Sequence, residues 1–224
     1  LVITKIANNS PIANSIKLNS IIIEAQKKKI RSANDLRDIT QEVLNSNQKT
    51  VLLAIYNNEN QDHSLEKVLD HTLIRDSKYA LENKKRVNLK YNIFNIDRTV
   101  GGMLSGQVAL KYGHEGLPKN TINIDFSGNA GQSFGAWLAK GITLNLSGDA
   151  NDYVGKGLSG GIISIKKNIN SKLISDQNII AGNTLLYGAI SGECYINGVV
   201  GERFAVRNSG ATAIVEGCGD HGAE

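Results

Sequence analysis

Glycine is missing from the first hundred residues of this 224-residue chain, and all 23 glycines lie between Gly101 and Gly222. The charge balance changes at the same place. Residues 1–100 carry 16 Lys and Arg against 11 Asp and Glu, whereas residues 101–224 carry 9 against 10. Two differently built regions therefore meet near residue 100. We expect a linker or divergent segment over 1–60, a helical lead-in over 61–100 and a glycine-rich domain over 101–224.

Cysteine and histidine are also scarce. Cys194 and Cys218 are the two thiols, and neither belongs to a CxxC pair, so the sequence encodes no zinc site and no cysteine-ligated iron–sulfur cluster. Free thiols in a reducing compartment are the simpler expectation. No His-Glu-x-x-His motif occurs, and His63 and His71, eight residues apart near one helical face, are expected to be structural.

Long apolar runs are absent, so no segment is expected to span a membrane. The basic runs at 27–31 and 84–86 have no interleaved aromatic residues to stack on bases, and we expect a solvated face rather than a nucleic-acid site. The sequence starts at Leu1 and its one methionine is Met103, so we expect a piece of a longer polypeptide, with any targeting segment outside it.

Periodicity predicts mixed structure before residue 100. An amphipathic helix is expected from Asn34, with one apolar face, and a buried strand over 51–56. The helix's apolar residues are Leu36, Ile39, Val43 and Leu44. Two helices are expected across 64–83, and the alternation of 87–91 predicts a strand.

After Gly101 an internal repeat appears. INIDFSG begins at Ile122, ITLNLSG at Ile142 and IISIKKN at Ile162, twenty residues apart each time. Gly128 and Gly148 occupy the same offset in the first two units, and an insertion follows around 168–177. A short strand cannot bury its inner face alone, so successive turns stack in parallel. We therefore expect a mainly β fold, a right-handed parallel β-helix (solenoid) preceded by a small α/β or helical linker region.

The stretch NDYVGKGLSGG (151–161) contains a Gly-x-Gly-x-x-Gly pattern. A dinucleotide-binding loop would need a helix directly after it, but the β-branched run beginning at Ile162 favours a strand. Glycine tolerates the positive φ that a tight corner requires. We interpret Gly155, Gly157, Gly160 and Gly161, together with Gly128 and Gly148, as structural corners and not as a cofactor site.

No catalytic constellation can be named. Asp125, Asp149 and Asp152 could imitate the paired carboxylates of a polysaccharide-cleaving β-helix, but Asp152 beside a glycine corner is more simply a turn residue that bonds its own backbone. Asp220-His221 lacks a recognisable nucleophile. We therefore expect no catalytic, cofactor-binding or metal-binding residues.

Arg203 and Arg207 lie four apart in GERFAVRNSG, a spacing that places both side chains on one face of a strand. They could be buried, paired with Glu202 or Glu216, or held by a neighbouring domain. The sequence leaves these alternatives open, and the two arginines are candidates for interdomain contacts.

Two long blocks resemble a known family: AGQSFGAWLAKGITLNLSGDANDYVGKGLSGG (130–161), and the stretch from AGNTLLYGAISGE to GVVGERFAVRNSGATAIVEGCGDHG (181–222). They are similar to the C-terminal GXGXG domain of the glutamate synthase large subunit. The resemblance extends upstream through QDHSLEKVLDHTLI (61–74) and 91–118 and covers roughly 60–224. Residues 1–60 most resemble a divergent stretch of the preceding linker. Family members often carry Cys after the Asp-His-Gly triplet, where this chain has Ala223.

The resemblance implies a right-handed β-helix within a multidomain enzyme. In that family an amidotransferase domain hydrolyses glutamine. The ammonia passes through a tunnel to a domain carrying FMN and a 3Fe-4S cluster, where it reacts with 2-oxoglutarate and the imine is reduced to glutamate. The β-helix is implied to be a non-catalytic scaffold that binds no cofactor. The partners implied are the amidotransferase and FMN-binding synthase domains, with ferredoxin or a small reductase subunit as electron donor, in the cytoplasm or plastid stroma.

Two alternatives stay open. The first is a β-helix subunit of another redox complex, such as that of formylmethanofuran dehydrogenase, which shares the glycine rhythm. The second is a carbohydrate-active β-helix, which would need a groove of carboxylates and aromatic residues. The chain has only 4 Phe, 7 Tyr and 1 Trp, so rings for stacking on sugars are few.

Overall fold

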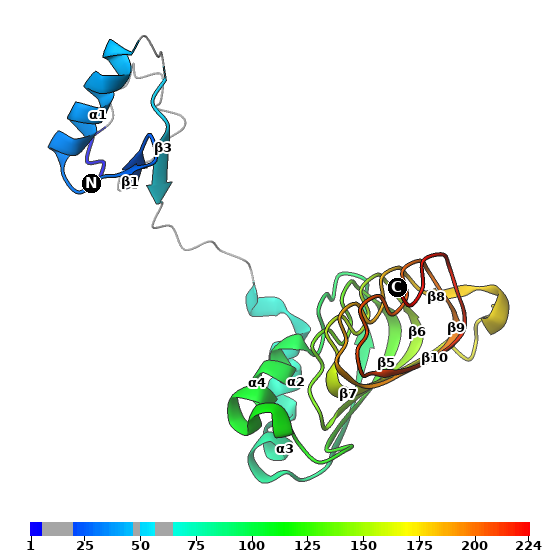
Figure 1. Cartoon of the computed structure of the whole chain (residues 1–224). Coiled ribbons are helices and arrows are strands. Elements are labelled where there is room, and N and C mark those ends of the chain that lie inside the picture. The colour runs from blue at the N-terminus through cyan, green and yellow to red at the C-terminus, as the bar shows by residue number, and fades with distance from the viewer. Residues whose placement is uncertain (6–19, 47–49, 57–64) are drawn as a thin grey trace. The chain divides into compact units, whose positions relative to one another are not determined.

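The structure is a computed structural model that describes residues 1–5, 20–46, 50–56 and 65–224 (Figure 1). The chain forms two compact units, Leu1–His63 and Ser64–Glu224.

The described part of the first unit holds a small antiparallel sheet and one helix. The sheet has the order β2-β1-β3. Its strands and the helix are β1 (Ile21–Ala25), β2 (Lys28–Lys29), β3 (Leu53–Tyr56) and α1 (Ala33–Asn45). Ser32 and Asp35 form a capping box, which satisfies backbone N–H groups at the start of α1.

The helix expected from Asn34 is confirmed, and it begins one residue earlier. Ile39 and Val43 are buried as expected, but Leu44 is 62% exposed and does not belong to the buried face. Ile39 packs in a small core with Ile22 and Ile30. The strand expected from Val51 begins at Leu53.

The second unit opens with helices. They are η1 (Leu65–Lys67), α2 (Leu69–Asp76), α3 (Lys78–Asn83), α4 (Gly102–Tyr112) and η2 (Gly113–Glu115). The two helices expected in this region are therefore present as α2 and α3. Buried Asp70 of α2 joins α2 to α4, because its carboxylate accepts backbone N–H groups of Gly101 (2.9 Å) and Leu104 (3.0 Å) at the α4 N-terminus.

Within residues 65–224, seven strands form one parallel sheet. Six of them lie side by side in chain order, β4, β5, β6, β7, β9 and β10, and β8 pairs with both β6 and β9. The strands are β4 (Val87–Ile93), β5 (Ile122–Ala130), β6 (Ile142–Ala150), β7 (Ser159–Lys166), β8 (Ile179–Ala181), β9 (Ser191–Val200) and β10 (Thr212–Cys218). A short helix, η3 (Ser175–Gln177), precedes β8. Ile122 lies opposite Ile142 and Gly128 opposite Gly148, so the twenty-residue repeat is a real register between β5 and β6.

The third copy of the repeat departs from that register. Ile162 lies opposite Thr143, not Ile142. The N–H groups of Ser159 and Gly161 both donate to the carbonyl oxygen of Leu138, each at 3.0 Å, and pairing resumes one residue out of step. After β7 ends at Lys166, the expected insertion leaves the sheet and returns as β8, which continues the same layer between β6 and β9 (Figure 1).

A second hydrogen-bonded ladder, which we call the turn stack, runs beside the sheet. It consists of the turns 133–137, 153–157, 184–188 and 203–207. In each turn the first, third and fifth residues have φ between 53° and 68°. Their N–H groups bond carbonyl oxygens at 2.7–3.0 Å, in or beside a neighbouring turn except for Gly135, whose N–H bonds Val100. Residues 221–224 begin a further turn, since Arg203 and Arg207 donate to carbonyl oxygens of Asp220 and Glu224.

The core fills the space between the sheet and the turn stack. Phe126 of β5 meets Phe134 of the first turn edge to face, with centroids 5.5 Å apart at 83°. Both rings are fully buried, as are Leu144 and Ile163 from the strands and Val154 from the second turn.

Candidate functional site

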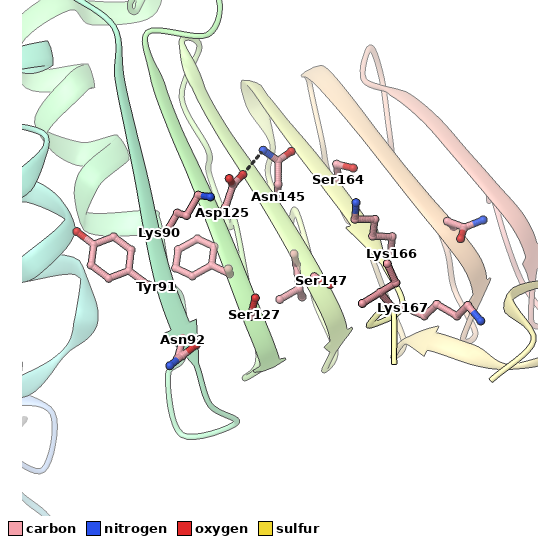
Figure 2. A pocket seen from close by; sticks show the side chains of 14 residues that line it. Lys90, Tyr91, Asn92, Asp125, Ser127, Asn145, Ser147, Ser164, Lys166 and Lys167 are labelled. Carbon is pink, nitrogen blue, oxygen red and sulfur yellow. Dashed lines mark hydrogen bonds between the residues drawn. The ribbon is translucent and has the colours of Figure 1, made fainter. Parts of the chain in front are cut away.

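The outer face of the sheet, which points away from the core, carries a broad polar depression (Figure 2). Its volume is about 920 Å³, and it runs across β4, β5, β6 and β7 to β9. Strand alternation explains its composition. In β5, for example, Ile124 and Phe126 are buried while Asp125 and Ser127 are exposed on the other face.

Parallel register aligns these side chains in rows. Lys90 lies opposite Asp125, Asp125 opposite Asn145, Asn145 opposite Ser164, and Ser164 opposite Tyr195. The result is a row of polar residues, one per strand, across the middle of the depression. The sequence repeat predicted neighbouring strands but not this row, because the row depends on the shifted register of β7.

Carboxylates on this face are held by neighbouring strands. Asn145 donates to Asp125 at 2.9 Å, Asn129 donates to Asp149, and Asn197 donates to Glu216. These bonds connect one strand to the next, so they brace the sheet. None of them joins two carboxylates in the way that acid–base cleavage of a glycosidic bond requires.

Glu193 has two side-chain partners. Its carboxylate accepts from Lys119 at 2.6 Å and from Tyr195 at 3.0 Å. The Lys119 hydrogen bond, followed by that of Tyr195, lowers the pKa of Glu193, and the same carboxylate raises the pKa of Lys119. Both partners stay charged near neutrality, which suits a bracing contact and not proton transfer.

Asp152 braces the turn stack in a similar way. Its Oδ1 accepts the N–H of Asn183 at 2.7 Å, and its own N–H donates to the side chain of Asn151. The expectation that Asp152 bonds its own backbone is therefore wrong. It is a turn residue, but its partner lies in the next turn.

The NDYVGKGLSGG stretch does not form a phosphate loop. The N–H groups of Tyr153, Gly155 and Gly157 donate to carbonyl oxygens of neighbouring turns, each at 2.9 Å, so they are not free to cradle an anion. The chain then enters strand β7 and not a helix.

The six glycines named from sequence fall in three places. Gly155 and Gly157 lie in the turn stack, whereas Gly160 and Gly161 lie at the start of β7. Gly128 and Gly148 face each other inside β5 and β6. A Cβ on Gly148 would overlap the carbonyl oxygen of Gly128, so that close approach of strands requires glycine.

Arg203 and Arg207 lie in a turn and not on a strand. Both are exposed, with φ of 57° and 55°. Neither pairs with Glu202 or Glu216 in the described structure, and Glu216 accepts from Asn197 instead. Their side chains remain available on the outside of the turn stack.

No group of three or more His, Cys, Asp or Glu that could hold a metal ion occurs among the described residues. His71 bonds the carbonyl oxygen of Leu65 at 2.9 Å, while His63 lies outside the described residues. Cys194 is buried, and burial raises its pKa to about 12, whereas Cys218 is exposed on β10. A 3Fe-4S cluster needs three thiolates, so this chain's two cysteines do not fit that group. Within the described ranges, no helix is long and apolar enough to cross a bilayer.

Sequence reasoning missed the turn stack, although a signal is present. Four five-residue stretches share an apolar residue at their second position: SFGAW from 133, YVGKG from 153, TLLYG from 184 and RFAVR from 203. That residue points inward: Phe134, Val154 and Leu185 are fully buried. The signal is weak because only some of the left-handed positions carry glycine.

Comparison with known proteins finds both a family and similar proteins. The family model described as the GXGXG motif matches residues 70–224. Glutamate synthase [NADH] of Saccharomyces cerevisiae is 56% identical over 156 residues, which is 70% of this chain and 7% of that protein. The glutamate synthase [NADPH] large chain of Bacillus subtilis is 51% identical over 165 residues, 73% of this chain and 11% of that protein.

Ferredoxin-dependent glutamate synthase 2 of Synechocystis is 48% identical over 161 residues, 71% of this chain and 10% of that protein. The chain thus matches only about a tenth of the length of these relatives. The family model, in contrast, covers most of the chain. This chain belongs to the GXGXG motif family.

Proposed function

We propose that this chain is the structural GXGXG domain of a glutamate synthase, without catalytic groups of its own. The parent reaction would convert glutamine, 2-oxoglutarate and two reducing equivalents with two protons into two glutamates. The observation that carries the proposal is the likeness to glutamate synthases of three electron-donor types, at about 50% identity over most of the chain.

The proposed architecture is a right-handed β-helix, with the sheet and the turn stack as two sides of each coil. Parallel β connections are right-handed in nearly all proteins, which favours this hand. Two hydrogen-bonded ladders along one core make a stiff body. A stiff body with a polar outer face suits the role of holding a glutaminase domain and an FMN-binding synthase domain in their working arrangement.

FMN and a 3Fe-4S cluster are proposed to belong to other parts of the parent protein. The two cysteines do not suffice for the cluster, and the N–H groups of Tyr153, Gly155 and Gly157 are already bonded to carbonyl oxygens and not directed at a flavin phosphate. The proposed partners are therefore the amidotransferase and synthase domains of the same polypeptide. Ferredoxin or a small reductase subunit would supply electrons to the parent enzyme, in the cytoplasm or plastid stroma.

The two alternatives are weaker. None of the relatives named above belongs to formylmethanofuran dehydrogenase. A carbohydrate-active site would need paired acidic groups, but the carboxylates of the outer face are bonded to amides or to Lys119.

Two measurements test the proposal. An immunoblot of whole extract under denaturing conditions should show a band many times heavier than 24.1 kDa. The isolated chain, mixed with FMN or with glutamine and 2-oxoglutarate plus a reductant, should neither bind the flavin nor release glutamate. A band at the mass of the chain itself would contradict fusion to catalytic domains, and flavin binding or glutamate release would contradict a purely structural role.

A further inference from the structure

A second cavity lies on the outside of the turn stack, away from the polar sheet face. Its volume is about 490 Å³, within the range of small-molecule sites. Two columns of side chains line it, because the turns stack in step. Tyr153 and Arg203 stand in one column with His221, at the first left-handed position of their turns. Lys156 and Tyr187 stand in the other column with Glu224.

Backbone bonds hold both columns in place. The first is linked by Tyr153 N–H to the carbonyl oxygen of Asn183 (2.9 Å) and by Arg203 N–H to that of Asp220 (2.9 Å). The second is linked by Gly157 N–H to the carbonyl oxygen of Tyr187 (2.9 Å). The cavity walls are therefore set by the ladder itself and need no loop to close.

The charge of the cavity is positive. Lys156 and Arg203 make no ion pair with a carboxylate anywhere in the described part of the chain. The ammonium of Lys156 lies 5.6 Å from the Tyr153 ring centroid, a cation–π contact that leaves its charge uncompensated. Glu224, the acidic residue of the lining, is bonded to His221 at 3.1 Å.

We propose that this cavity binds a small organic anion, whose carboxylate or phosphoryl group is held by Arg203 and Lys156 beside the phenols of Tyr153 and Tyr187. The planar guanidinium matches both anionic groups with two parallel hydrogen bonds, and phenol hydroxyls can donate to the remaining oxygens. The site does not depend on the proposed role in glutamate synthase.

The test is calorimetric titration of the full chain with succinate and, separately, with inorganic phosphate. We expect saturable binding of at least one of them at one site per chain. Arg203→Gln should weaken it by about tenfold or more, because charge-assisted hydrogen bonds contribute about 1.5–3 kcal/mol. Binding of succinate alone would identify a carboxylate ligand, and binding of phosphate alone a phosphoryl ligand.

Arg207→Gln is the matched control. Arg207 lies in the same turn with nearly the same φ, is also exposed, and does not line the cavity. Arg207→Gln removes the same charge at a place outside the cavity lining, so it should leave the affinity unchanged. Lys156→Gln, outside the left-handed positions, provides a second variant should Arg203→Gln unfold. Equal weakening by Arg203→Gln and Arg207→Gln, or no saturable binding of either anion, would overturn the proposal.

Discussion

The sheet and the turn stack solve the same problem with different backbones. Both form ladders along one core, and both must pair every N–H that they bury. The sheet does so with extended residues such as Ile122 and Ile142, which β-branched side chains favour. The turn stack does so with residues in the left-handed region, which cost about 1–2 kcal/mol each for any residue but glycine.

The comparison shows that local preference is not what selects the turn-stack conformation. Leu186 and Trp137 adopt φ of 57° and 53° although neither favours it. Their turns gain hydrogen bonds to the turns on either side and bury apolar side chains such as Phe134. Tertiary contacts therefore offset the local cost.

The largest expected contrast is chemical and lies between an inner strand of the sheet, β9, and its edge strand, β10. With a pKa of about 12, Cys194 keeps only about one part in ten thousand as thiolate at pH 8, and it is buried. Iodoacetamide should therefore label native protein once, at exposed Cys218, and unfolded protein twice, as read by mass spectrometry. Cys218→Ser should give no label in the native state. Labelling of native Cys218→Ser would mean that the sheet opens on its inner face.

Phe126→Ala and Phe134→Ala compare the core contributions of sheet and turn stack. Both rings are fully buried and contact each other, so each truncation should lower the free energy of unfolding by about 3–5 kcal/mol. The single Trp137 lies in the turn stack, so its fluorescence reports the unfolding of this unit. Phe94→Ala, at a side chain 63% exposed, should change stability by less than about 0.5 kcal/mol. A small cost at Phe134 alone would show that the turns relax where the sheet does not.

Gly157→Ala and Gly188→Ala separate backbone strain from side-chain contact. Both glycines occupy the fifth position of a turn with φ of 62°. A Cβ at Gly157 would lie 2.7 Å from the Trp137 ring, whereas one at Gly188 meets nothing within 4 Å. We expect a loss of about 1 kcal/mol at Gly188 and about 2 kcal/mol or more at Gly157, measured by urea denaturation. Equal losses would mean that the indole moves aside freely.

The smallest expected effect is a pH-dependent change in stability from Tyr91 in β4, the edge strand at the start of the parallel sheet. Burial, then the hydrogen bond to Asp76 (2.7 Å), raises the pKa of Tyr91 to about 12. An unfolded tyrosine titrates near 10, so the folded state holds this proton more tightly. The stability difference between wild type and Tyr91→Phe should be constant below pH 10 and change as pH rises from 10 to 12, to the disadvantage of wild type. Denaturation midpoints at pH 8 and pH 11 measure it, and parallel pH profiles of the two proteins would contradict it.

Many of the strands and helices could be predicted from the sequence. The spacing of Ile122 and Ile142 predicted parallel neighbours in register, because equivalent side chains must stack on the same face. The helix was expected from its apolar period, whereas its start at Ala33, one residue before Asn34, follows from the Ser32 cap seen in the structure. The register of β7 could not be read in this way, since it depends on two N–H groups sharing the carbonyl oxygen of Leu138.

The sites were less accessible from sequence. Arg203 and Arg207 were singled out, but an assumed strand placed them together on one face, and the structure puts only Arg203 at the cavity. The difference arises because alternating left-handed residues do not follow the period of a strand.

By itself, the sequence determined the change of composition near residue 100, the repeated strands and the lack of a cluster-binding cysteine set. These depend on composition and local period, which a single chain carries openly. Only the tertiary structure decided where the left-handed turns lie, which strand slips, and which charges face one cavity. Those features arise from hydrogen bonds between residues seventeen or more positions apart, whose energy outweighs local preference.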